Sequence, residues 1–130
     1  MTKPRGFSLV ELMVSVAILS VGIVLVIRSF LLTAWAQDIA MNTVRAAYLA
    51  DNVMGELEGQ AMANSGLDLQ SHQEPVAVNS RAGVLASEVA AVDDEALETL
   101  VEARCAVMWN DGRGGRQAGL VGYMKKKSPG

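Results

Sequence analysis

The sequence has few of the residues from which disulfides, metal centres and nucleophilic sites are built. Its 130 residues include one cysteine, Cys105, and one histidine, His72. A single cysteine excludes an internal disulfide, and with one histidine it leaves too few ligands for a structural zinc site. Basic side chains number 11 against 14 acidic ones, which excludes the strongly positive face of a nucleic-acid-binding protein. We therefore expect neither a metal nor a nucleic-acid partner.

Charge is nearly missing from residues 7–27, which contain Glu11 as their one charged side chain. As a helix, this stretch is about 31 Å long, the thickness of the hydrocarbon core of a bilayer. Lys3 and Arg5 precede it, and the positive-inside tendency therefore predicts a cytoplasmic start with the remainder across the membrane. A cleaved secretory signal fits poorly, because the apolar run is too long and continues without a small-residue cleavage site into Arg28.

Helix breakers are scarce beyond the apolar run. Residues 29–64 contain no proline, and their glycines are Gly55 and Gly59. We expect residues 28–64 to continue the helix outside the membrane and to end near Asn64–Gly66. Mostly apolar residues recur at helical spacing and predict the packed face: Leu32, Trp35, Ile39, Thr43, Ala46, Ala50, Val53, Leu57 and Ala61.

Residues 65–130 predict a small head that contains β-structure. Leu67–Glu74 is polar and closed by Pro75, which indicates a loop. Val84–Val92 fits either a strand or a short helix, and Asp93–Glu95 fits a turn or a helix start.

The end of the chain predicts a hairpin. Apolar residues alternate from Val101 to Trp109, the glycine-rich stretch 110–116 indicates a hairpin loop, and Ala118–Met124 predicts the return strand. The expected fold class is α+β, a long N-terminal helix packed on a small antiparallel sheet.

No set of residues in the sequence predicts catalysis. We expect Cys105 to be a buried small hydrophobe on the face of its strand, and His72 to lie at the surface of a loop. Gly112–Gly115 lacks the lysine pattern of a phosphate loop, and Asp93–Glu95 matches no calcium-loop template. The chain is therefore expected to be neither an enzyme nor the carrier of a cofactor, with no small-molecule substrate.

The segment from Lys3 to Gly22 resembles the amino-terminal signature of type IV pilins and of the pseudopilins of type II secretion. The match consists of a short basic leader ending at Gly6, then Phe7, then Glu11 at the fifth position after the junction. In that family a prepilin peptidase cuts after the glycine on the cytoplasmic side and methylates the new amine. The resemblance implies a discarded leader, residues 1–6, and an N-methylated Phe7.

The resemblance also implies a role for Glu11 in assembly. A carboxylate inside an apolar helix is unfavourable by a few kcal/mol unless it has a partner. The amine exposed at Phe7 of a neighbouring subunit supplies one. Removing Lys3 and Arg5 leaves 9 basic side chains against 14 acidic ones, so the processed chain is acidic. We expect Lys125–Lys127 to be a solvated tail, with contact to an acidic neighbour or a lipid headgroup as the alternative.

Residues 46–58 and 100–112 resemble minor pseudopilin I of type II secretion and the related minor pilin V of type IV pili. This resemblance implies a pilin-like fold and a subunit at the tip of a short periplasmic filament, anchored in the inner membrane, that starts filament assembly. Its partners are then the prepilin peptidase and the other minor and major pseudopilins. A minor type IV pilin and an unprocessed, single-pass membrane-anchored binding protein stay as alternatives.

Overall fold

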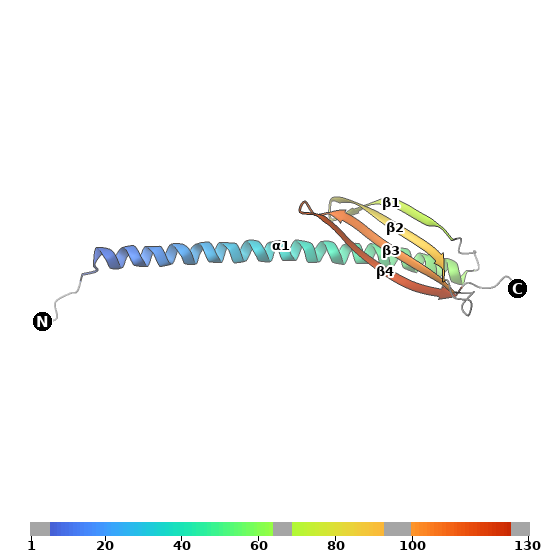
Figure 1. Cartoon of the computed structure of the whole chain (residues 1–130), viewed down its shortest axis with the longest axis horizontal. Coiled ribbons are helices and arrows are strands. Elements are labelled where there is room, and N and C mark those ends of the chain that lie inside the picture. Colours follow the sequence, from blue (N-terminus) through green and yellow to red (C-terminus); the bar gives the residue numbers. More distant parts are fainter. Residues whose placement is uncertain (1–5, 64–68, 93–99, 126–130) are drawn as a thin grey trace. The chain divides into compact units, whose positions relative to one another are not determined.

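The computed structural model describes residues 6–63, 69–92 and 100–125 (Figure 1). These residues form one helix and four strands: α1 (Leu9–Met62), β1 (Ser71–Val78), β2 (Arg81–Ala91), β3 (Leu100–Asn110) and β4 (Gly115–Lys125). The chain divides into two compact units, Met1–Asp38 and Ile39–Gly130.

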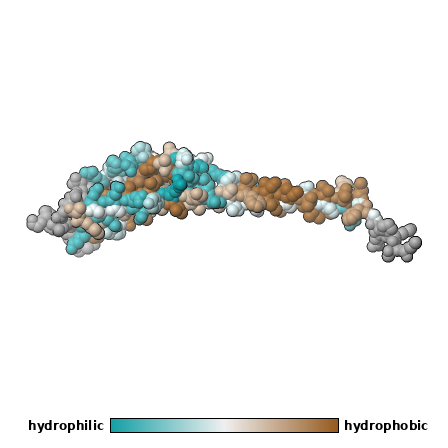
Figure 2. Space-filling model, turned by 180° about the vertical axis from the view of Figure 1, so that it is seen from behind, coloured by the Kyte–Doolittle hydropathy of each residue, from teal (hydrophilic) through white to brown (hydrophobic). Residues whose placement is uncertain are grey.

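The described part of the first unit is the N-terminal portion of α1. Every residue from Gly6 to Gln37 is exposed, although most of them are apolar. Figure 2 shows this portion as an almost continuous brown surface, whereas the second unit has large hydrophilic areas. An apolar helix with no protein packed around it needs another apolar environment. By length and composition α1 is able to cross a membrane.

The second unit is a four-stranded antiparallel sheet packed on the end of α1. Its strands lie in chain order, β1-β2-β3-β4, so consecutive strands are neighbours. The α+β, pilin-like architecture expected from the sequence is confirmed. Val84–Val92, whose sequence fits either a strand or a short helix, lies mostly in strand β2. Of the other expected features, the helix stop at Gly66 and the turn at Asp93–Glu95 lie outside the described residues.

The core forms where one face of the sheet meets α1. The alternation predicted for residues 101–109 is confirmed, because Val101, Ala103, Cys105, Val107 and Trp109 are all buried. From α1, the buried side chains are Asn42, Ala46, Ala50 and Met54, spaced four residues apart. Successive positions at this spacing share one helix face, and that face covers the sheet.

The helical stripe expected from the sequence is only partly correct. Ala46 and Ala50 are buried and Val53 is half-buried, but Thr43 is exposed and Asn42 beside it takes the core position. Neither polar atom of the Asn42 side chain has a hydrogen-bond partner among the described residues, and the same is true of the Trp109 indole nitrogen. Apolar periodicity could not find Asn42, because a polar side chain breaks the pattern that defines the buried face.

The loop predicted over Leu67–Glu74 is wrong from Ser71 onward, because β1 begins there and continues through Pro75. A proline is tolerated in an edge strand whose nitrogen faces away from its neighbour, and β1 is such an edge. Asn79 and Ser80 join β1 to β2 with φ values of 48° and 67°. Positive φ at both positions is typical of the two-residue turns that suit the twist of a hairpin.

The second hairpin lies close to its predicted position. β3 ends at Asn110 and β4 begins at Gly115, so the loop is shorter than the glycine-rich stretch of the sequence. Gly112 has a φ of +85°, a conformation that side chains strongly disfavour, which explains a glycine at this point of the turn.

Candidate functional site

The N-terminus of α1 is stabilised by its own sequence. Ser8 precedes the helix, and its hydroxyl oxygen accepts a hydrogen bond of 3.2 Å from the amide of Glu11. The Ser8 carbonyl accepts the first helical hydrogen bond, 3.1 Å from the amide of Leu12. Serine at the N-cap with glutamate three residues later is a capping-box pair, and a carboxylate in the first turn is favourable beside the helix dipole. The helix therefore starts two residues after Phe7.

The bond between Gly6 and Phe7 lies just outside the helix. Gly6, Phe7 and Ser8 have no regular secondary structure, and the side chain of Phe7 is 78% exposed. No heavy atom beyond the neighbouring residues lies within 4 Å of the position a Gly6 Cβ would occupy. A peptidase requires a backbone segment that it can reach and extend, and this bond meets that requirement. The leader charges Lys3 and Arg5 lie outside the described residues.

Glu11 is the one charged side chain in the apolar part of α1 between Phe7 and Ile27. It is exposed, and among residues 6–63, 69–92 and 100–125 its carboxylate has no hydrogen-bond or ion-pair partner. The surrounding side chains are apolar and equally exposed, including Leu12 at 56% and Met13 at 64%. A carboxylate in such a setting calls for a partner from outside the described chain.

The other polar groups of this segment are satisfied within the helix. The hydroxyl of Ser15 donates a 2.8 Å hydrogen bond to the carbonyl of Glu11, and that of Ser20 donates a 2.7 Å bond to the carbonyl of Val16. These bonds satisfy both hydroxyl groups within the helix, as an apolar environment requires. Gly22 has open space around it, so it leaves room for close approach by another helix. Glu11 therefore differs from Ser15 and Ser20, whose side chains find their partners within α1.

Cys105 and His72 do not form a reactive site. Cys105 is 1% exposed, and burial raises the pKa of its thiol, which disfavours the nucleophilic thiolate. His72 is exposed at the surface as expected, but on β1 rather than in a loop, and its Nε2 lies 4.0 Å from Oε2 of Glu74. His72 and Glu74 line a groove of about 310 Å³ beside α1 and β2. No group of three metal-ligating side chains occurs within the part of the chain that the structure describes.

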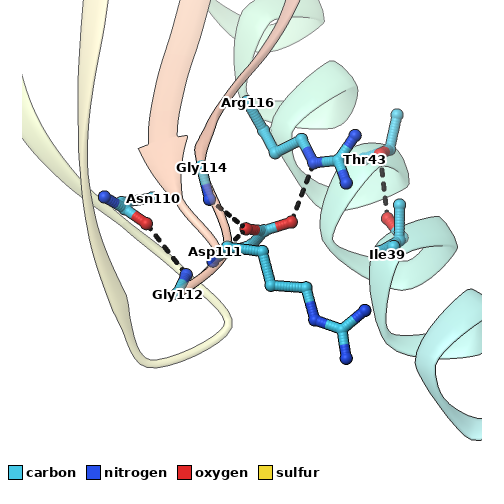
Figure 3. Close-up of polar contacts among 8 residues, drawn as sticks. Ile39, Thr43, Asn110, Asp111, Gly112, Gly114 and Arg116 are labelled. Carbon is cyan, nitrogen blue, oxygen red and sulfur yellow. Dashed lines mark hydrogen bonds and ion pairs between the residues drawn. The ribbon is translucent and has the colours of Figure 1, made fainter.

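The hairpin loop between β3 and β4 is a structural feature held by Asp111 (Figure 3). One carboxylate oxygen accepts hydrogen bonds from the amides of Arg113, at 2.9 Å, and Gly114, at 3.0 Å. The other accepts a 2.8 Å bond from Nε of Arg116. The Arg116 guanidinium, followed by these amides, lowers the pKa of Asp111 to about 2.

The comparisons with known proteins concern the N-terminus. Residues 1–27 match the family described as the prokaryotic N-terminal methylation motif. No curated protein and no solved structure matches the chain. The motif covers Gly6, Phe7 and Glu11 and indicates a prepilin-type, type IV pilin-like protein, consistent with processing by a prepilin peptidase and with membrane anchoring.

Proposed function

We propose that the chain is the precursor of a minor pseudopilin, a structural subunit at the tip of the filament of a type II secretion system. The peptidase cuts between Gly6 and Phe7, methylates the amine of Phe7 and so releases a subunit for assembly. The observation that carries the proposal is the unpartnered carboxylate of Glu11 on an exposed apolar helix that bears the methylation motif.

Cleavage creates the partner that Glu11 lacks. The new amine at Phe7 is positively charged and lies four residues before Glu11 in the sequence, just ahead of the start of α1. In a bundle of such helices, the amine of one subunit pairs with the carboxylate of its neighbour. A charge-assisted bond of this kind is favourable where water is scarce, because both charges would otherwise be poorly solvated. Pairing between subunits thus favours assembly over the separate state.

The proposed topology follows from the same segment. Residues 1–6 are cytoplasmic, residues 7–27 span the inner membrane, and residues from 28 onward lie in the periplasm. After assembly the span becomes part of the filament core. We propose that residues 65–130 act through contact and not through catalysis, since burial raises the thiol pKa of Cys105 and the described part of this head holds no group of three metal-ligating side chains.

The test is replacement of Glu11 by alanine in cells that contain the peptidase and the filament system. We expect Glu11→Ala to be cleaved and methylated normally, as shown by mass spectrometry of the N-terminal peptide. Incorporation into sheared filaments should fall by at least about tenfold, since a charge-assisted hydrogen bond contributes about 1.5–3 kcal/mol. Glu58→Ala is the matched control, because Glu58 is an exposed glutamate of the same helix outside the span.

Three results separate this proposal from its alternatives. Unchanged incorporation of Glu11→Ala would refute the charge pairing. An intact leader, or a terminus other than methylated Phe7, would favour an unprocessed anchored binding protein. Co-purification with type IV pilus subunits alone, with secretion unaffected by deletion of the gene, would favour a minor type IV pilin.

A further inference from the structure

The two edges of the sheet differ in their capacity to bind another strand. β1 and β4 are the outer strands, and each has backbone groups that no described strand covers. β1 contains Pro75 near its centre, preceded by the polar residues His72 and Glu74. Proline has no amide hydrogen, and its nitrogen must face away from β2, so the free edge of β1 lacks a donor at this point. Such an edge is protected against pairing.

β4 carries none of these protections along most of its length. Its residues from Gln117 to Met124 include no proline and no charged side chain. Its register with β3 is continuous over eleven residue pairs, from Asn110↔Gly115 to Leu100↔Lys125, with no bulge. Val121 is 58% exposed and Tyr123 is 61% exposed. A long, regular and uncharged edge strand is the feature that binds an added strand from another chain.

The charges of β4 lie at its two ends. Arg116 stands near the start and Lys125 at the end, and the sequence continues with Lys126 and Lys127. Arg116 is partly neutralised by its bond to Asp111. Lys125 has no ion-pair partner within the described residues, so the end of β4 carries the stronger positive charge.

This distribution disfavours a second copy of the chain as the occupant. Antiparallel pairing of two β4 strands with their ends aligned brings Lys125 of one copy close to Arg116 of the other, and parallel pairing with aligned ends places Lys125 opposite Lys125. Like charges directly opposite each other destabilise a sheet. Pairing of β4 with β1 of another copy is opposed by Pro75. Both routes to self-association are therefore unfavourable.

We propose that β4 is a docking edge for an extended segment of a different protein, uncharged along its centre and carrying acidic residues at its ends. The segment adds a fifth strand to the sheet through backbone hydrogen bonds, and its side chains pack beside Val121 and Tyr123. Its acidic ends pair with Lys125 and Arg116. The inference rests on the proposed filament role only in taking this partner to be another filament subunit.

The test measures binding of synthetic peptides to the full-length protein in detergent micelles by fluorescence anisotropy. The probe is a peptide of about ten residues with alternating valine and threonine and a glutamate at each end. One control peptide carries lysines at its ends, and another has a central proline in the glutamate-ended sequence. We expect the glutamate-ended peptide to bind about tenfold more tightly than the lysine-ended one, and the proline peptide not to bind.

Two variants test the charge argument on the protein side. Lys125→Glu should weaken binding of the glutamate-ended peptide by about three- to tenfold. Arg45→Glu changes the net charge equally at an exposed position of α1 and should have no effect. Equal effects of the two variants, binding of the proline peptide, or no binding of the glutamate-ended peptide would each overturn the proposal.

Self-association decides the identity of the occupant. If β4 binds another protein, sedimentation of the micellar protein should reveal no dimer that dissociates when the glutamate-ended peptide is added. Such a dimer would assign β4 to a second copy of the chain instead. Peptide binding does not require cleavage at Gly6. It therefore fails or succeeds independently of the Glu11→Ala filament experiment, and the two results test the two proposals separately.

Discussion

The contact between Met54 of α1 and Gly122 of β4 is expected to hold the helix on the sheet. Met54 is 6% exposed, and a Cβ added at Gly122 would lie 3.1 Å from its sulfur and 3.5 Å from its Cε. Met54→Ala removes these atoms from the core, and buried methionine-to-alanine changes lower the free energy of unfolding by about 2–5 kcal/mol. A small domain has only about 5–15 kcal/mol in total, so the loss is large.

A double-mutant cycle separates this contact from a general loss of packing. Gly122→Ala alone should lower the free energy of unfolding by about 1 kcal/mol, because the added methyl crowds the thioether. In the double variant the methyl occupies space that the shortened side chain has vacated. We expect the double variant to be more stable than the sum of the single changes predicts, by about 1 kcal/mol.

Urea unfolding of the micellar protein, followed by Trp109 fluorescence, measures these changes. Trp35 is replaced by phenylalanine in every sample, so that the signal comes from the buried Trp109 alone. Strictly additive effects, or a Met54→Ala change below about 1 kcal/mol, would refute the contact as the main attachment of the helix.

Three further predictions concern the second unit, Ile39–Gly130. The pKa of Asp111 lies below its ordinary value of 3.8, at about 2, so its stabilising effect is full above pH 3.8 and is lost as the pH falls toward 2. The melting temperature of Asp111→Asn should therefore lie below that of the parent at pH 6 and converge with it near pH 2. Asn42→Leu should raise the free energy of unfolding by about 1–2 kcal/mol in urea titrations, because it removes two buried polar atoms without partners; a decrease would indicate a buried partner for them. Cys105 should react with iodoacetamide at pH 8 only after unfolding, since burial raises its thiol pKa; rapid labelling of the folded protein would contradict its burial.

Local features of the sequence were sufficient for the N-terminal part of the molecule and for the last hairpin. The capacity of α1 to cross a membrane depends on the length of an apolar run, and the helix start depends on Ser8 and Glu11, which lie close together in the chain. Strand β3 is predicted from apolar residues that alternate every two positions, and the loop after it is predicted from glycines within one turn of the chain. Each of these patterns can be recognised without knowing what lies across the fold.

Only the tertiary structure decided which residues of α1 meet the sheet and where the sheet ends. Asn42 is buried because of the way the sheet crosses the helix, and the spacing of apolar residues along the helix does not specify that crossing. Pro75 and the polar residues before it predict a loop, yet Pro75 lies in strand β1. β1 is an edge strand, so a proline nitrogen on its outer side needs no hydrogen-bond partner within the sheet. The sequence by itself determined the methylation motif and the apolar run at the N-terminus, since both are made of residues that are neighbours in the chain. Strand order, exposed edges and the buried helix face arise from contacts between distant residues.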